Sequence, residues 1–350
     1  MLDQVRALGP TLRELSPTID RAAAVPPEIV DALLDLGVFR LATPAAAGGL
    51  EAPPERMVEI FEELGRADGA TGWVAMIGAG TGIALAWLEP DVAKRMLADP
   101  RFLIAGVAAP MGRAEPVDGG WRLTGRWAFS SGCRHATWLV AGAMTPSGVR
   151  MCVLPAADVT IHDTWQVMGL RGTGSHDFSV HDVFVPAEHV FSLAGPPYAS
   201  GALYRIPPFT TLSIGIAAVA LGIARGAIED FTALAATKPG RPAFRNAVAE
   251  ATALHRSGLA YLQSELVQGG AGKVRRAAQR LAIATGTRHA ARAVDLLYSA
   301  AGGTAVYDAG PLQQRFRDVH AATQHAMVSA DIVETAGAVL LGEKVDSTRL

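Results

Sequence analysis

Apolar residues recur at helical spacing along the first hundred positions of the chain. Between residues 28 and 39 they stand at positions 29, 30, 33, 34 and 36, and Gly37 then ends the run. Residues 54–64 repeat this spacing, and an uncharged stretch over residues 69–88 follows. The pattern predicts a helical unit over residues 1–100.

Residues 101–195 show a different pattern, of short runs rich in β-branched and aromatic residues. Turns that contain glycine separate these runs, as at residues 118–120 and 172–174. Closely spaced runs of this kind predict a small antiparallel barrel or sandwich. The expected strands cover residues 103–107, 121–127, 137–143, 149–154 and 178–185.

Long apolar stretches return in residues 196–350. They predict helices over residues 212–237, 244–268, 274–301 and 320–341, which is a bundle of about four helices. The fold class expected from the whole pattern is a mainly α protein with a central β domain between two helical domains.

Composition and charge exclude several classes of function. Half of the residues are hydrophobic, 18% are charged, and the net charge is −2 without a basic block, so we expect neither nucleic acid nor an anionic membrane as a partner. Cys133 and Cys152 make neither a disulfide framework nor a metal site. With no signal peptide recognised at the N-terminus, the expected location is cytoplasmic.

Two features imitate other kinds of protein. The uncharged stretch 69–88 is long enough to cross a bilayer, but acidic residues flank it and no positive-inside bias is present, so we expect a buried helix. Gly78, Gly80 and Gly82 resemble a dinucleotide fingerprint, yet Ile83 occupies the third glycine position and no βαβ pattern surrounds it.

A polar cluster near the C-terminus, residues 315–325, stands out from its apolar surroundings. It contains two arginines, Asp318, His320 and His325. Histidine has an unperturbed pKa near 6.5, which suits proton transfer near neutral pH. We expect His325 to be the functional group, and His320 to lie at a helix start or on the surface. The two histidines are five residues apart, which does not place them on one helix face as a zinc pair.

Three segments together resemble the acyl-CoA dehydrogenase superfamily over nearly the whole chain. They are residues 27–50, with Gly48-Gly49-Leu50 at the end; residues 125–138, which include Phe129-Ser130-Ser131-Gly132; and residues 165–186, which include Gly172-Thr173-Gly174-Ser175. Their order and spacing match the N-terminal helix and loop, the flavin-facing segment and the following β segment of that family.

Within the superfamily, the wording of the second and third segments is most similar to the two-component flavin monooxygenases. Many acyl-CoA dehydrogenases carry a catalytic glutamate nine residues after the arginine of a late Arg-Asp pair. Counting from Arg317 leads to Ala326, which cannot remove an α-proton. The resemblance therefore favours oxygen transfer over dehydrogenation.

The resemblance implies an enzyme that takes reduced flavin, FMN or FAD, from a separate reductase. Reaction with O2 gives a flavin hydroperoxide, which hydroxylates a small aromatic or polycyclic substrate. We expect a dry pocket, and at least one of Ser130 and Ser131 to bond the flavin ring. His325 is expected to act as the base that takes a proton from the substrate.

Further residues receive roles from the same resemblance. We expect Trp127, Phe129, Gly132 and Trp165 to lie against the flavin ring. Arg241 and Arg245, from a neighbouring subunit, are expected to bind its phosphate, because a guanidinium suits phosphate. The substrate pocket is expected to include His135, Gly174 and Ser175.

Three alternatives stay open at this point. The chain could be a dehydrogenase with a displaced base, an N-hydroxylase of an amino sugar, or a non-catalytic relative on the same scaffold. In each case the apolar bundle helices predict a homodimer or homotetramer.

Overall fold

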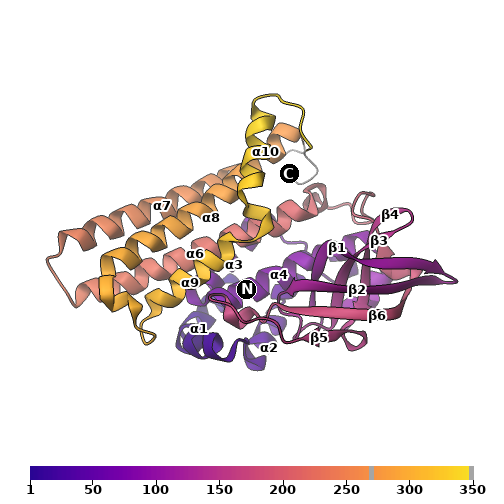
Figure 1. Cartoon of the computed structure of the whole chain (residues 1–350), viewed down its shortest axis with the longest axis horizontal. Coiled ribbons are helices and arrows are strands. Elements are labelled where there is room, and N and C mark those ends of the chain that lie inside the picture. Colours follow the sequence, from indigo (N-terminus) through magenta and orange to yellow (C-terminus); the bar gives the residue numbers. More distant parts are fainter. Residues whose placement is uncertain (268–271, 347–350) are drawn as a thin grey trace.

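Helices and strands occupy separate parts of the chain in this computed structural model, which describes residues 1–267 and 272–346. Figure 1 shows the helical bundle at one end of the molecule and the β-sheet at the other. The helices are α1 Leu2–Ala22, α2 Pro27–Asp35, α3 Pro54–Ala67, α4 Gly69–Thr81, α5 Pro90–Leu97, α6 Pro208–Ala236, α7 Pro242–Val267, α8 Lys273–Ala301, α9 Pro311–Thr323 and α10 Ala330–Leu340. The strands are β1 Ile104–Val117, β2 Gly120–Ser130, β3 Trp138–Thr145, β4 Gly148–Pro155, β5 Thr160–His162, β6 His176–Pro186 and β7 Val190–Phe191.

Helix α6 lies at the centre of the helical part and contacts α3, α4, α7, α8 and α9. Glycines let the backbones of α3 and α6 approach closely. A Cβ at Gly222 would overlap the carbonyl oxygen of Glu62 and lie 2.8 Å from the backbone nitrogen of Arg66. Glycine lowers intrinsic helix propensity, but the close contact between α6 and α3 requires a residue without a side chain at this position.

Within the part of the chain that the structure describes, two segments are long and apolar enough to cross a membrane by length and composition: Gly69–Trp87 and Pro208–Ala236. The protein itself buries 94% and 83% of their most apolar windows. The first of them is the stretch expected to be a buried helix, and the structure places it in the core as α4 and a following 3-10 turn.

The seven strands form one sheet in the order β5-β6-β2-β1-β3-β4-β7. The sheet is mixed, because β1 and β3 are parallel, whereas an all-antiparallel arrangement was expected. The cause is the connection over residues 131–137. Strand β2 runs back along β1, the connection then crosses to the other side of β1, and β3 starts beside the start of β1. This crossing places residues 129–137 at the end of the sheet that meets α4, where Gly132 lies against Val74.

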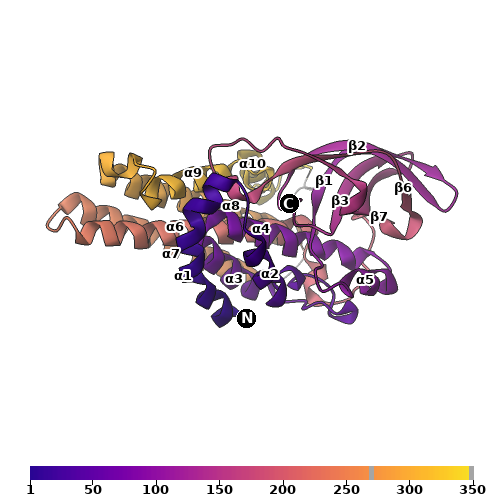
Figure 2. The same cartoon turned by 90° about the horizontal axis from the view of Figure 1, so that it is seen from below.

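The sheet has its own hydrophobic core, separate from that of the helices, and Trp127 is its largest fully buried side chain. Its indole Nε1 donates a hydrogen bond of 2.8 Å to the carbonyl of Gly142, and its ring stacks on Phe178 at 4.9 Å. Figure 2 shows the sheet lying over the side of the N-terminal helices.

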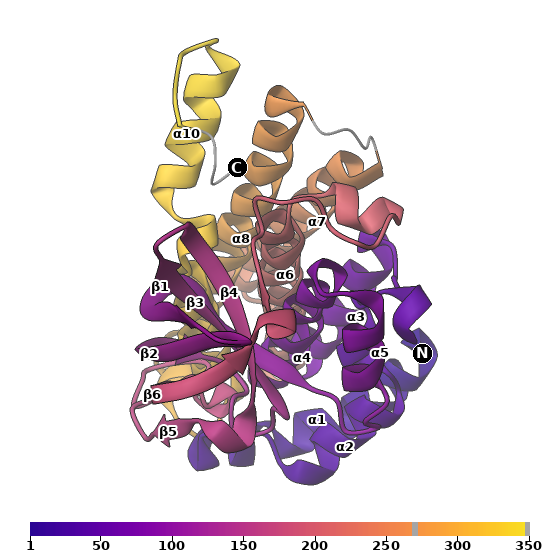
Figure 3. The same cartoon turned by 90° about the vertical axis from the view of Figure 1, so that its right-hand side faces the viewer.

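The last expected helix, residues 320–341, is wrong. The chain forms α9 and then α10, with a break between them in which His325 precedes a 3-10 turn. The ring Nδ1 of His325 accepts a hydrogen bond of 3.2 Å from the backbone nitrogen of Met327, so the histidine caps the turn instead of continuing a helix. His320 lies in the last turn of α9, and not at a helix start. Figure 3 shows α10 directed away from the sheet beside α8.

Two glycine substitutions test the close packing of α6. Gly222→Ala should lower the free energy of unfolding by about 1–3 kcal/mol, because the added methyl group meets the backbone of α3. Gly337 lies in α10 with open space around its Cα, so Gly337→Ala should raise stability by about 0.5–1 kcal/mol. Urea denaturation of both variants measures the difference, and equal effects would contradict the packing described for α6.

Candidate active site

Two loops of the β domain meet over the N-terminal part of α4. One follows β2 and the other precedes β6, and the backbone nitrogen of Gly132 donates to the carbonyl of Thr173 at 2.9 Å. A non-glycine residue adopts the left-handed region in each segment, Phe129 at the end of β2 with φ 67° and Leu170 in the loop before β6 with φ 51°. Such backbone strain is uncommon outside functional sites and turns.

A chain of hydrogen bonds runs from helix α4 through both loops. Trp73 Nε1 donates to Ser131 Oγ at 3.1 Å, and the hydroxyls of Ser131 and Ser175 are 2.7 Å apart. The hydroxyls of Ser175 and Thr173 are also 2.7 Å apart, and Thr173 Oγ1 donates to the carbonyl of Leu170 at 2.7 Å.

The two ends of this chain set its direction. A carbonyl only accepts and an indole only donates, and each hydroxyl has a single hydrogen. The hydrogen of Thr173 is used on Leu170, so Ser175 must donate to Thr173 and Ser131 must donate to Ser175. The hydroxyl hydrogen of Ser131 is therefore already used inside the protein.

Ser130 differs from its neighbour. It ends β2 opposite His176 and is fully buried, and its Oγ has no hydrogen-bond partner among the described residues. A buried polar group left without a partner costs about 1–3 kcal/mol. Its hydroxyl hydrogen is thus unused among the described residues, whereas that of Ser131 is already bonded.

The ring of His325 packs against that of Trp73, with 5.8 Å between the ring centroids. Burial, and then the positive charge of Arg280, lowers the pKa of His325 to about 4. Arg280 also holds the capped turn, since its guanidinium donates to the carbonyl of Met327 at 2.9 Å. His325 is therefore neutral at neutral pH. Because Nδ1 accepts from Met327, we assign its proton to Nε2.

Two aromatic side chains form an apolar edge beside Ser130. Phe129 is 72% exposed, and its ring meets that of Trp165 edge-on at 6.2 Å. Trp165 is held by its indole, which donates to the carbonyl of Leu170 at 3.0 Å. An exposed phenylalanine in a strained conformation needs a partner to cover it, and a flat ring system would do so.

Trp127, which was expected against the flavin ring, does not belong to this edge and lies fully buried in the core of the sheet. In a regular strand, residues 127 and 129 would face the same side. The pairing of β2 with β6 shifts register between Trp127 and Ser130, and Phe129 adopts a positive φ. Phe129 therefore turns outward while Trp127 stays in the core of the sheet.

Four other expected site residues lie in the two loops or directly beside them. Gly132 and Gly174 both adopt positive φ and form the loop contact, and Ser175 is in the hydroxyl chain. His135 is bonded through its backbone nitrogen to Gly132, and burial, followed by Arg134, lowers its pKa.

Arg241 and Arg245 are not brought to the loops within one chain. They belong to the turn and first part of α7, and Figures 1 and 2 both show the α6–α7 turn at the end of the bundle opposite the sheet. The guanidinium of Arg241 lies over the ring of Phe244 at 5.3 Å.

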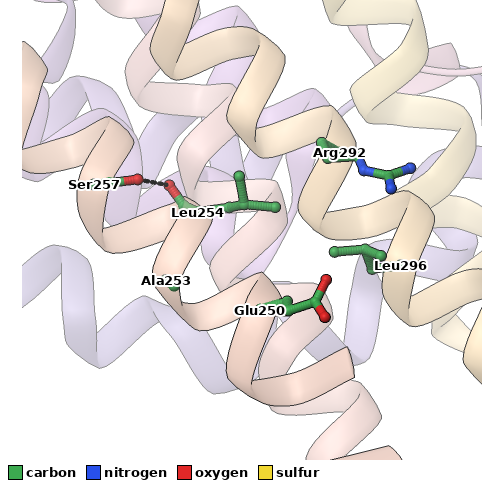
Figure 4. Close-up of a pocket in the computed structure, with 6 residues that line it drawn as sticks. All are labelled: Glu250, Ala253, Leu254, Ser257, Arg292 and Leu296. Carbon is green, nitrogen blue, oxygen red and sulfur yellow. Dashed lines mark hydrogen bonds between the residues drawn. The ribbon is translucent and has the colours of Figure 1, made fainter. Parts of the chain in front are cut away.

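A separate surface groove of about 440 Å³ runs between α7 and α8. Figure 4 shows its walls, with Glu250, Leu254 and Ser257 on α7 and Arg292 and Leu296 on α8. None of its residues belongs to the hydroxyl chain or to the His325 turn, so it is a feature of the bundle surface and not of this site.

The residues that could hold a flavin fit that group. Ser130 offers an unused hydroxyl hydrogen from a buried position, and Phe129 and Trp165 offer an apolar edge for a flat ring. Sequence reasoning did not identify Trp73 or Thr173 as members of the site. An indole inside an uncharged stretch does signal a need for a buried acceptor, but nothing in the sequence names Ser131 as that acceptor.

Comparisons with known proteins identify the family to which the chain belongs. The pattern of the acyl-CoA dehydrogenase N-terminal domain matches residues 4–98, and that of the acyl-CoA dehydrogenase C-terminal domain matches residues 214–330. The chain is 31% identical to indole-3-acetate monooxygenase of Pseudomonas putida over 347 residues, covering 93% of this chain and 89% of the relative.

A second relative and a solved structure are similar to the chain over nearly its whole length. The chain is 32% identical to the oxygenase subunit HsaA, a flavin-dependent monooxygenase of Rhodococcus jostii, over 358 residues, covering 93% of this chain and 94% of that protein. It superimposes on the crystal structure of the 3-HSA hydroxylase from Rhodococcus sp. RHA1 with a TM-score of 0.94 and 28% identity, over 99% of this chain and 98% of that one. The expected fold class is confirmed, and the chain belongs to the acyl-CoA dehydrogenase superfamily, among its flavin-dependent monooxygenases.

Proposed function

We propose that this protein is the oxygenase component of a two-component system and hydroxylates a small aromatic or polycyclic substrate. The observation that carries the proposal is a neutral His325 next to Ala326, in the segment where the resemblance expects a catalytic glutamate in dehydrogenases. One oxygen atom of O2 enters a C–H bond of the substrate, and the other leaves as water with two electrons and two protons. Relatives named for indole-3-acetate oxidation and as an oxygenase subunit support this class of reaction.

A bound reduced flavin supplies the two electrons and activates O2, and a separate reductase delivers it. Ser130 would hold the ring by donating its unused hydroxyl hydrogen. Phe129 and Trp165 would cover the ring and exclude water. Ser131 has a different task, which is to join Trp73 to the loop that contains Ser175.

His325 suits the role of a hydrogen-bond donor better than that of a base. Its Nδ1 accepts from Met327, so Nε2 has the hydrogen, and a pKa of about 4 makes it a weak proton acceptor at neutral pH. We therefore replace the expected base with a neutral imidazole that donates from Nε2 to an oxygen atom of the substrate.

We further infer that two or more copies assemble, as a dimer or tetramer. Arg241 and Arg245 lie at the end of the bundle opposite the sheet, so they can reach a flavin phosphate only on another copy of the chain. The groove between α7 and α8, which contains Leu254 and Leu296, supports contact between copies along this face.

The reaction class is tested with purified protein, chemically reduced flavin and a panel of phenols and indoles under ¹⁸O2. Product with one added ¹⁸O atom is the expected result. The dehydrogenase alternative makes the opposite prediction, in which an acyl-CoA bleaches bound oxidised flavin without O2. A chain that binds flavin in neither redox state would point to the non-catalytic alternative.

The two serines are separated by flavin affinity. Ser130→Ala should weaken binding of reduced flavin by about 3- to 10-fold, because one hydrogen bond is worth about 0.5–1.5 kcal/mol. Ser131→Ala should leave that affinity nearly unchanged and lower stability, because Trp73 Nε1 and Ser175 lose their partner. Anaerobic flavin titration and thermal unfolding measure both effects. Loss of affinity in Ser131→Ala alone would reverse the assignment.

The role of His325 is tested by a pair of variants. Glutamine keeps an N–H donor and alanine does not, so His325→Gln should retain product within about 10-fold while His325→Ala releases the reduced oxygen as H2O2. Product yield and peroxide are measured together. Equal loss of product in both variants would restore the base assignment.

The pH dependence of stability gives an independent control for the same pair. The folded-state pKa of His325 lies below the unfolded value of 6.5, so the unfolded chain binds more protons between pH 4 and 6.5. This group therefore contributes a rise in stability as the pH increases through that window, by at most about 3 kcal/mol. The contribution is absent in both variants, and a wild-type curve that matches theirs would contradict the lowered pKa.

A further inference from the structure

A buried carboxylate from helix α9 lies behind the two loops. Asp318 is 2% exposed, and its Oδ1 accepts a hydrogen bond of 2.6 Å from the backbone nitrogen of Leu170. The two residues are 148 positions apart in sequence. This contact ties the C-terminal bundle to the loop before β6.

Leu170 uses every backbone polar group it has in the architecture of the site. Its N–H bonds Asp318, and its carbonyl accepts from both Trp165 Nε1 and Thr173 Oγ1. The first of these donors belongs to the aromatic edge and the second to the hydroxyl chain. One residue thus orients both groups, and it does so in a left-handed conformation that a leucine rarely adopts.

The loop is pressed closely onto α9 beside this bond. A Cβ at Gly169 would overlap the carbonyl of Arg317, so the backbone of the loop lies directly on the helix. On the other side, Oδ2 of Asp318 would be 3.2 Å from a Cβ at Gly69, at the start of α4. Asp318 therefore lies where α4, α9 and the loop meet.

Burying a carboxyl group here costs free energy, because its charged form loses contact with water. The net effect of its surroundings raises the pKa of Asp318 to about 7: burial raises it most, the Leu170 N–H bond and Arg317 lower it, and Asp68 and Asp20 add to the rise. With this pKa the group is about half ionised at pH 7, and its Oδ1 can accept the Leu170 N–H bond in either form. The position thus combines a costly group with one short bond to a strained residue.

We propose that Asp318 is a positioning residue, whose bond to Leu170 holds the loop so that Trp165 and the hydroxyl chain keep their places beside Ser130 and His325. Asp318 touches neither substrate nor cofactor in this scheme and acts through Leu170. The inference rests on the proposed function only for its effect on turnover.

The test compares Asp318→Asn with Asp318→Leu in the full-length, flavin-free chain. Asparagine keeps an acceptor for the Leu170 N–H, and leucine fills the same space without one. Hydrogen–deuterium exchange of residues 165–175 should become at least 10-fold faster in Asp318→Leu and stay within 3-fold of wild type in Asp318→Asn. Wild-type exchange in Asp318→Leu, or equal exchange in the two variants, would overturn the proposal.

A matched control uses an acidic side chain that bonds α9 from another helix. Asp295 on α8 bonds His320 at 2.8 Å, so Asp295→Ala removes a polar contact to the same helix without touching the loop. Its exchange over residues 165–175 should equal that of wild type, and an increase as large as that of Asp318→Leu would assign the effect to α9 in general.

Turnover provides the second readout. With reduced flavin at saturating concentration, Asp318→Leu should lose product formation at least 10-fold and release H2O2, because Trp165 and the hydroxyl chain lose their common anchor at Leu170. A loss confined to flavin affinity would contradict a positioning role. Because the exchange measurement needs no flavin, an oxygenase assay that fails for wild type would reject the proposed function without altering the exchange result.

If Asp318→Leu does not fold, the wild-type chain itself decides. In ¹⁵N-leucine-labelled protein, the Leu170 amide should resonate far downfield and exchange as slowly as the helical amides of α9. An amide that exchanges at the rate of exposed loop amides would show that Asp318 does not hold it.

Discussion

The hydrogen bond from the Trp73 indole to Ser131 joins the two parts from which the site is built. Trp73 belongs to the buried helix α4, and Ser131 belongs to the loop that crosses from β2 to β3. Thr173 uses its hydrogen on the Leu170 carbonyl, so Ser175 and Ser131 must each donate toward that end of the chain, and the Trp73 indole donates into the other end. The neighbouring Ser130 has no partner for its hydroxyl among the described residues, and the ring of His325 packs against that of Trp73.

The same fold supports dehydrogenation and oxygen transfer, and the difference lies in a few groups at one site. A dehydrogenase needs a carboxylate that can take a proton, whereas this chain has Ala326 and a neutral histidine beside it. Burial and Arg280 disfavour the charged imidazolium, so the local field opposes positive charge at this place. The apolar edge of Phe129 and Trp165 is suited to keeping water away from an oxygen-transfer reaction.

Sequence reasoning worked best where the signal is local. Helical spacing located α2 and α3 to within a few residues, and the segment 125–138 led to the loop that contains Ser130 and Ser131. It failed where neighbours in space decide the outcome. The break between α9 and α10 was missed because His325 caps a turn with its side chain. The inward position of Trp127 was missed because a shift in strand pairing and one positive φ separate it from Phe129.

The sequence by itself determined the fold class and the branch of the family, because periodicity and motif spacing depend only on residues close together in the chain. Only the tertiary structure decided the roles of individual polar groups. Ser130 and Ser131 are adjacent and chemically identical, yet one is unused and the other is fully bonded, because Trp73 and Ser175 come from distant segments. Asp318 likewise acquires its partner from 148 positions away. Hydrogen-bond accounting needs coordinates, because each donor and acceptor can be counted only once its neighbours are known.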